Sequence, residues 1–494
     1  MATIFNTNDA VFFVGGRGTK TGDADAGGGA AKEAWEGALD ENLANVMGTN
    51  GEPLSDSSAW NGSKSACNIA NNGGSKVRIT KTGAFSFCTT GLIANVDFYS
   101  AYFDGRYEVT AVDGSGNYID IDLTFMSTEM CDVKVGGAFD KLQTALDNTD
   151  ASAGSPHNVT IFTNKPETLS GVGDQIDVDT GGGNGSAGTW KRIIGVDDDG
   201  AELAEGSYVD YDGNGQSCHV FKILNVQCIE LRHICALDSA DSHYGFYITA
   251  TDYCQGFLLN DCKSTDCKYG VYSDTIRIRG ITIIGGHYSS ATGPALYLNG
   301  SRWVFVIGTE LAGSLAGALI DGDVVGTLVV DGCVLYKTGN FVGGVYTDSW
   351  DTFLIVRNCV FYNIDDCIKL NDPESRLVQY NNIFVLHTAA TGKIINRIAG
   401  AIKYSDYSCA WALDGAPAAS GRWGEEDKPA NDIEVDPQFV DVDSGDFRTR
   451  ETKVLRGGRR DIAGNVTQMG AVLQKYQFDR RAKTANLGRL QIMR

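Results

Sequence analysis

Proline is scarce in this sequence, with 8 residues among 494, whereas glycine is abundant with 61. That balance suits many tight turns between short strands better than long helices or a flexible linker protein. The sequence also lacks any run of about 18 consecutive apolar residues, the length that a membrane-spanning helix needs. It therefore predicts an all-β architecture and no membrane partner.

Positive charge is also in short supply. The chain has 41 Lys and Arg residues against 62 Asp and Glu residues, which gives a formal net charge of −21. Such a charge disfavours generic binding to nucleic acid, so no nucleic-acid partner is expected. The first residues, MATIFNTNDAVFFVGG, lack the basic segment and the long apolar segment of a secretory signal. We therefore expect a soluble protein made in the host cytoplasm without a signal peptide.

Paired C-x-x-C motifs are absent, although the chain has 13 cysteines, nine of them between Cys218 and Cys367. An odd number without zinc spacing predicts neither a disulfide framework nor a structural zinc site. Cysteine is among the most buried residue types, so reduced thiols in the core are the expectation. We predict no metal and no cofactor.

The middle of the chain repeats two short apolar runs with a period in the twenties. At equivalent positions of the first run stand Ile234, Cys262, His287, Glu310, Cys333, Cys359 and Ile383. The second run is centred on Phe246, Val271, Leu296, Leu319, Val345, Ile368 and Ile395. Both runs are rich in β-branched residues and are bounded by Gly, Asn and Asp, which predicts a β-solenoid whose repeats bury their apolar faces against their neighbours. We expect the second column to point inward along the solenoid axis.

This pattern resembles the right-handed parallel β-helix of the pectate-lyase-like superfamily, where each coil holds two or three short strands. The resemblance covers residues 136–472. The stretch GGAFDKLQTALDN at 136–148 has an amphipathic helical pattern and is similar to the helix that covers the first coil of such proteins. The predicted fold class is therefore all-β, a right-handed parallel β-helix solenoid with an N-terminal capping helix and a separate small N-terminal β domain.

Residues 1–135 are predicted to form that small β-rich domain, with an attachment role. Residues 103–125 read as a hairpin, in which the strands RYEVTAV and YIDIDLTF flank the turn DGSGN. This hairpin is similar to small barrel-like modules of bacteriophage virion proteins.

The stretch DPQFVDVDSGDFR at 436–448 resembles the closing coils of β-helix proteins, so a structural role as a terminator is expected. Residues 473–494 are predicted to form a basic C-terminal arm that docks on an acidic neighbour, either another assembly protein or a second copy. The partner-binding residues of that arm are Lys475, Arg480, Arg481, Lys483 and Arg489.

Many β-helix proteins cut polysaccharides, and FYNIDDCIKLND at 361–372 offers a candidate site. It resembles the Asp-Asp-Cys step of polygalacturonase-type hydrolases, which implies general acid and water-activating roles for Asp365 and Asp366. The Asn-Thr-Asp step that such enzymes carry on the preceding coil is absent. A column of Asp274, Asn299, Asp348 and Asn371 could hold Ca²⁺ in a lyase, although such columns more often form hydrogen-bonded ladders between turns.

Tyr297, Tyr346 and Tyr362 are candidates for a glycan-binding stripe, because tyrosine combines an apolar ring with a polar tip. The leading hypothesis is a structural component of a bacteriophage or virus-like particle, such as a tail spike, fibre or capsid decoration. Its expected partners are other virion proteins, copies of itself in a possible trimer, and a host polysaccharide. The alternative is a polysaccharide depolymerase, either a lyase or a glycoside hydrolase. A bacterial surface adhesin fits the solenoid but not the N-terminal sequence.

Overall fold

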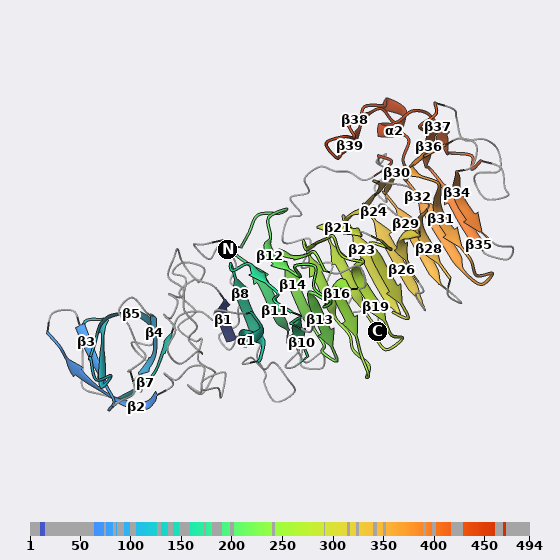
Figure 1. Ribbon diagram of the computed structural model, residues 1–494. Coiled ribbons are helices and arrows are strands. Elements are labelled where there is room, and N and C mark those ends of the chain that lie inside the picture. The colour runs from blue at the N-terminus through green and yellow to red at the C-terminus, as the bar shows by residue number, and fades with distance from the viewer. Residues whose placement is uncertain are drawn as a thin grey trace.

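The computed structural model shows an elongated stack of short parallel strands and a small β-barrel (Figure 1). Its described residues are 10–14, 64–73, 76–82, 85, 93–98, 105–125, 130–136, 142–147, 159–171, 174–179, 190–197, 202–239, 243–290, 292–313, 317–322, 326–338, 343–348, 352–388, 392–397, 402–415, 428–459 and 468–470. No helix among them is long and apolar enough to cross a membrane.

Three parallel sheets run along the stack, and successive strands of the chain pass from sheet 1 to sheet 3 to sheet 2. Sheet 1 contains β1 (Ala10–Val14), β8 (Val159–Thr163), β11 (Lys191–Gly195), β14 (Ile229–Arg232), β17 (Phe257–Asn260), β20 (Ile281–Ile284), β23 (Trp303–Ile307), β26 (Thr327–Asp331), β29 (Phe353–Arg357), β32 (Arg376–Tyr380) and β35 (Ile402–Asp406). Sheet 2 contains β10 (Ile176–Val178), β13 (Phe221–Leu224), β16 (Tyr244–Thr249), β19 (Tyr269–Asp274), β22 (Leu296–Asn299), β25 (Ala318–Asp321), β28 (Gly343–Thr347), β31 (Asp366–Leu370) and β34 (Lys393–Arg397). Sheet 3 contains β9 (Glu167–Thr168), β12 (Val209–Asp212), β15 (Ile234–Leu237), β18 (Lys263–Thr265), β21 (His287–Ser290), β24 (Glu310–Gly313), β27 (Val334–Lys337), β30 (Val360–Ile364), β33 (Ile383–Leu386), β36 (Cys409–Ala412) and β37 (Ile433–Glu434).

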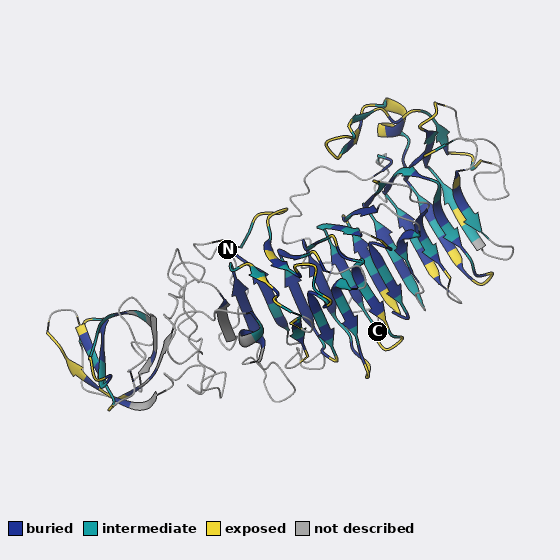
Figure 2. Cartoon of the chain, in the orientation of Figure 1, coloured by how far each residue is buried: buried dark blue, intermediate teal, exposed yellow. Residues whose placement is uncertain are grey.

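The chain is thus a parallel β-solenoid, and the all-β prediction is confirmed. Buried residues run along the strands, and exposed residues gather in the loops and the C-terminal segment (Figure 2). One continuous core fills the stack from Val14 to Ala412. Stacking is what makes this core possible, because a single coil cannot enclose its own apolar face.

The inward column of sheet 2 follows the predicted register at all but one position. Each pair of neighbouring strands aligns one member with the next, and every member is buried. In β25, however, Ile320 and not Leu319 pairs with Leu296 and Val345. Ala318, Leu319 and Ile320 are all buried, so the apolar run alone does not determine which of them is in register.

The first predicted column is wrong by one residue at His287, Glu310 and Ile383. Backbone hydrogen bonds place Cys262, Gly286, Thr309, Cys333, Cys359, Asn382 and Ser408 in one column at the corner between sheets 1 and 3. Small or polar residues occupy that corner. An alignment that follows apolar runs therefore selects the next residue along the chain at several coils. A side chain at Gly286 would place its Cβ 1.9 Å from the carbonyl oxygen of Cys262, so this position requires glycine.

The residue before each of these corners turns the chain through the left-handed region. Positive φ angles between 48° and 67° recur at His233, Asp261, Gly285, Gly308, Gly332, Asn358, Asn381 and Tyr407. Glycine, asparagine and aspartate tolerate this conformation best, which explains why NDC, GGH, DGC, RNC and YNN recur in the sequence.

At the N-terminal end, α1 (Leu142–Asp147) and β1 lie against the first coil. Leu142, Ala145 and Leu146 join the solenoid core, and the Gln143 side chain bonds both the N–H and the C=O of Asp177 in β10. β10 is the edge strand of sheet 2, so this contact satisfies part of an open edge. Of the predicted 136–148, Gly136 belongs to β7 and residues 142–147 form the helix, while 137–141 and 148 lie outside the described residues; its role as a cap stays a prediction.

Before α1, six antiparallel strands close into a barrel with its own apolar interior. They are β2 (Lys64–Asn71), β3 (Lys76–Thr80), β4 (Ile93–Phe98), β5 (Gly105–Val112), β6 (Tyr118–Asp122) and β7 (Met130–Gly136). The predicted hairpin is β5 and β6, closed by a hydrogen bond from Asp113 N–H to the carbonyl of Tyr118. β1 pairs with β8 of the solenoid, so the predicted domain 1–135 contributes one strand outside the barrel.

The C-terminal segment folds back onto the outer side of sheet 3. The hairpin of β38 (Phe439–Asp441) and β39 (Asp446–Thr449) is followed by α2 (Thr452–Arg456). Phe447, Val454 and Met469 pack on the outward residues Val334, Val360, Ile383 and Cys409. DPQFVDVDSGDFR therefore covers an apolar outer column instead of ending the stack.

Candidate functional site

A row of tyrosines crosses the outward face of sheet 2. Tyr247, Tyr272 and Tyr297 occupy one outward column on β16, β19 and β22. Tyr244 and Tyr269 form a second column beside it. We call these five residues the aromatic row, and each is only partly buried.

The rings of the aromatic row stack on one another along the solenoid axis. Ring centroids lie 5.1 Å apart for Tyr244 and Tyr269 and also for Tyr272 and Tyr297, with interplanar angles of 16° and 11°. His219 continues the stack beyond Tyr244 at 4.7 Å. Because the ring faces cover each other, the row presents ring edges and phenol groups to solvent.

Polar contacts fix the phenol groups of the row. The Tyr247 hydroxyl donates a 2.6 Å hydrogen bond to Oδ2 of Asp274. Burial and this bond raise the pKa of Tyr247 to about 12. Burial lowers the pKa of His219 to about 4, with His243 adding to the shift, so His219 is neutral near pH 7. The row is therefore uncharged but rich in hydroxyl donors and acceptors.

The sequence contains a signal for this row that the two apolar columns do not include. YGFY at 244–247 and YGVY at 269–272 repeat one Y-G-x-Y motif at the coil period. The glycine is required because a Cβ at Gly245 would lie 2.2 Å from Oγ of Ser264. The two tyrosines flank it on the outward side.

Two of the three predicted glycan-binding tyrosines share one outward column. Tyr297 and Tyr346 are separated by Asp321 of β25. Tyr362 lies on sheet 3, where its ring centroid is 5.3 Å from that of Phe447, under the C-terminal segment.

The predicted catalytic aspartates have separate partners. Asp365 Oδ2 lies 3.7 Å from Nζ of Lys337, whose side chain is 6% exposed. Asp366 accepts a 3.0 Å hydrogen bond from Asn396. Burial raises the pKa of Tyr346, and the charges of Asp366 and Asp365 add to the shift. Tyr346 lies on β28, which pairs with β31, the strand that begins at Asp366, and its direct partner there is Lys369.

The predicted Asp/Asn column behaves as a ladder where it is described. Asp274 aligns with Asn299, and the Asn371 amide donates a hydrogen bond to the Asp348 carboxylate one coil away. Among the residues that the structure describes, no group of three or more His, Cys, Asp or Glu side chains could hold a metal ion.

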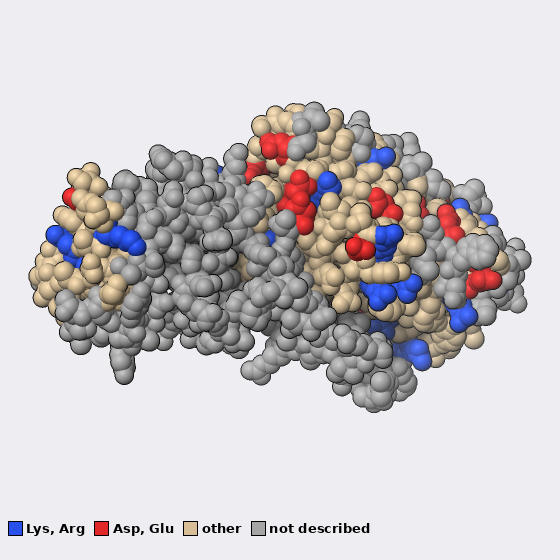
Figure 3. Space-filling view, turned by 90° about the horizontal axis from the view of Figure 1, so that it is seen from below, with Lys and Arg blue, Asp and Glu red and all other residues tan. Residues whose placement is uncertain are grey.

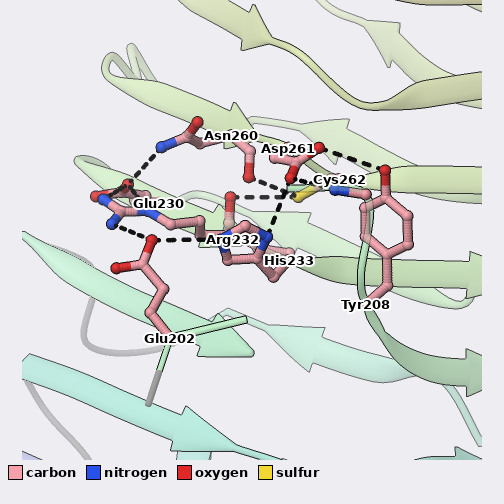
Figure 4. A network of polar contacts seen from close by, with 10 residues as sticks. Glu202, Tyr208, Glu230, Arg232, His233, Asn260, Asp261 and Cys262 are labelled. Atoms are coloured by element: carbon pink, nitrogen blue, oxygen red, sulfur yellow. Dashed lines mark hydrogen bonds and ion pairs between the residues drawn. The ribbon is translucent and has the colours of Figure 1, made fainter. Parts of the chain in front are cut away.

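A buried polar network joins two coils to the segment before β12 (Figure 4). His233, at the corner after β14, has Nε2 3.3 Å from Oε1 of Glu202 and Nδ1 3.1 Å from Oδ2 of Asp261. Asp261 also accepts hydrogen bonds from Gly206 N–H at 3.0 Å and from the Tyr208 hydroxyl at 3.3 Å.

Arg232 completes this network by pairing with Glu202 at 3.0 Å and with Glu230. Burial alone would lower the pKa of His233, but its contacts with Asp261 and Glu202 outweigh burial and raise that pKa. His233, Glu230 and Asp261 are each at most 6% exposed. Because these charges pair with one another at buried or mostly buried side chains, the network fastens the segment 202–208 to the two coils.

The five predicted partner-binding residues, Lys475, Arg480, Arg481, Lys483 and Arg489, lie outside the described residues. On the face that Figure 3 shows, acidic and basic side chains are interspersed, and neither sign forms a continuous patch among the described residues.

Comparison with known proteins adds no relative. No protein-family model, no curated protein and no solved structure matches this chain. The fold places it among parallel β-solenoid proteins.

Proposed function

We propose that this protein is a structural component of a bacteriophage or related virus-like particle, and that its aromatic row binds a glycan of the host surface. A tail spike, a fibre or a capsid decoration each fits this role. Other virion proteins and further copies of the chain are its proposed partners, and the virion is its proposed location.

The solenoid supports the structural half of this proposal. Its core is continuous along the stack, so bending or opening one coil also exposes the faces of its neighbours. A separate closed barrel on the N-terminal side offers a compact module for attachment. The resemblance of the barrel hairpin to virion modules is the reason for naming a phage particle.

The aromatic row is the observation that carries the glycan-binding half. Tyrosine offers an apolar ring edge and a hydroxyl, which match the C–H and O–H groups of a sugar. Coils about 4.8 Å apart present these groups at a regular spacing, as a polymer with repeating units requires. His219 at one end is neutral, and the charges that border the row are of both signs, with Asp274 bonded to Tyr247 and Lys268 5.1 Å from the ring centroid of Tyr269.

Quantitative mass spectrometry of purified particles tests the structural half. The proposal predicts that the chain is present at a fixed copy number per particle and resists removal by high salt. Absence from particles that are propagated in cells expressing the protein would contradict it.

One observation favours the depolymerase alternative. Tyr346 and Asp366 lie on the paired strands β28 and β31 of sheet 2, and Asp365 directly precedes β31. If sugars bind along this sheet, the carboxylates are within the same region, and an assay for cleavage products separates binding from cleavage.

A further inference from the structure

From β23 onward, the outward side of sheet 1 has an apolar column along its middle. Its middle outward column is formed by Phe305, Val329, Ile355, Val378 and Tyr404. Trp303 and Phe353 stand beside it in a second outward column, which also holds Thr327 between them and the exposed Arg376 after Phe353. We call these seven apolar residues the sheet 1 face.

This face is in contact with solvent. Trp303 is 49% exposed, Tyr404 44% and Phe353 37%, and the four aliphatic and aromatic residues between them are partly exposed. Parallel strands with apolar residues on both sides are normally covered on both sides. Earlier in the same column, Arg192 and Glu230 form an ion pair at 3.5 Å, so the apolar character is specific to the later coils.

The outward columns of the other two sheets are either covered or partly polar. On sheet 3 the outward residues Val334, Val360 and Ile383 are covered by Phe447 and Met469 of the C-terminal segment. On sheet 2 the outward column carries tyrosines, Asp321 and Lys369. A contiguous apolar patch that remains exposed marks an interaction surface.

We infer that the sheet 1 face binds the same face of a second copy of this chain. Two solenoids have the same rise per coil, so their outward columns remain in step over several coils, which a partner without this repeat cannot achieve. Local charge also permits the contact, because Arg357 neutralises Asp331 at 2.7 Å at the edge of the face. The inference rests on the proposed structural role for its purpose, but its test does not depend on a particle.

The net charge of −21 sets a condition on this association. Two copies repel each other at long range, and salt screens that repulsion to about 8 Å at physiological ionic strength. An apolar contact is not weakened by moderate salt. Self-association should therefore become stronger as salt rises from low to physiological concentration.

Sedimentation of the full-length chain over a range of concentrations tests the inference. Wild type should sediment as two or more copies, and Val329→Glu or Ile355→Glu should associate about a hundredfold more weakly, because a buried unpaired charge is costly. Asn299→Glu adds the same charge on the outward side of sheet 2 and should leave association unchanged. If a glutamate variant does not fold, Trp303→Gln tests the same face at a half-exposed side chain and should also weaken association.

A monomer at every concentration and salt, or association that the sheet 1 variants leave unchanged, would overturn the inference. Neither result affects the particle test of the proposed function, since a monomer can still be incorporated through other contacts. Loss of association in Asn299→Glu alone would place the interface on sheet 2 and would also overturn it.

Discussion

Asp432 accepts a 2.7 Å hydrogen bond from the backbone N–H of Ser408 through Oδ1, while its buried Oδ2 has no hydrogen-bond partner among the described residues. Burial raises the pKa of Asp432 from its ordinary value of 3.8 to about 7. The hydrogen bond from Ser408 opposes this rise, and the negative charge of Asp406 adds to it. The folded state therefore favours the neutral carboxyl group. The contribution of the neutral Asp432 carboxyl group to the free energy of unfolding is complete below pH about 4 and declines as the pH rises to about 7.

Asp432→Asn should remove this dependence on pH. We expect the variant to be close to wild type at pH 4 and more stable at pH 8, by up to about 3 kcal/mol. Urea unfolding of both proteins at the two pH values measures the difference. If wild type and variant differed in stability by the same amount at pH 4 and pH 8, Asp432 would have to be ionised in the folded protein at both pH values.

His233 should titrate above the ordinary histidine range, because Asp261 and Glu202 stabilise its protonated form. Its stabilising effect is present below pH about 6.5 and is lost as the pH rises through the raised pKa. NMR titration should therefore show His233 protonated when ordinary histidines have lost their proton. His219 provides the internal contrast, since it should stay neutral down to about pH 4. Glu202→Gln should lower the pKa of His233, and an unchanged value would remove Glu202 from the network.

Leu296→Ala should destabilise the solenoid by about 2–5 kcal/mol, because the side chain is fully buried between Val271 and Ile320 in the inward column. The exposed Leu413, at 45%, offers a control in which the same substitution costs less than about 1 kcal/mol. Denaturant unfolding measures both changes. Equal effects at the two positions would contradict the inward register of sheet 2.

If the protein binds glycans and does not cut them, Asp365→Ala should lower the stability of the fold, and neither wild type nor the variant should release products from a polysaccharide. The substitution leaves Lys337 buried without its ion-pair partner and should cost about 1–3 kcal/mol. Asp366→Ala, which loses only a hydrogen bond from Asn396, should cost less. Reducing-sugar and unsaturated-product assays on host polysaccharides should be negative for wild type. Products that disappear in both variants would establish the depolymerase alternative.

The period of apolar runs was enough to predict a parallel solenoid, because each coil must place a β-branched or apolar residue inward at the same point. The same logic failed at the corners, where Gly286, Thr309 and Asn382 are selected for size and hydrogen bonding and not for burial of apolar surface. At Leu319 it failed for another reason, since three consecutive residues of β25 are buried.

The functional surfaces were harder to predict. Tyr297 and Tyr346 are predicted as single residues, whereas the repeated Y-G-x-Y motif that marks the aromatic row contributes only its inward residue to the predicted columns. The partners of His233 could not be predicted, because Glu202 and Tyr208 come from a segment without the coil period. The fold-back of Phe447 onto sheet 3 is a tertiary contact that no local pattern records.

Calorimetric binding of short host-surface oligosaccharides to the purified full-length protein tests the central claim most directly. The account predicts a saturable interaction that Tyr272→Ala weakens by about tenfold or more, since removal of one aromatic anchor typically costs over 1 kcal/mol. Tyr404→Ala, at an exposed tyrosine of sheet 1, should bind as wild type does. Short ligands keep avidity between associated copies out of the measurement. Binding that is unchanged in Tyr272→Ala, or absent in wild type for every oligosaccharide of a host to which particles carrying this chain attach, would contradict glycan recognition by the aromatic row.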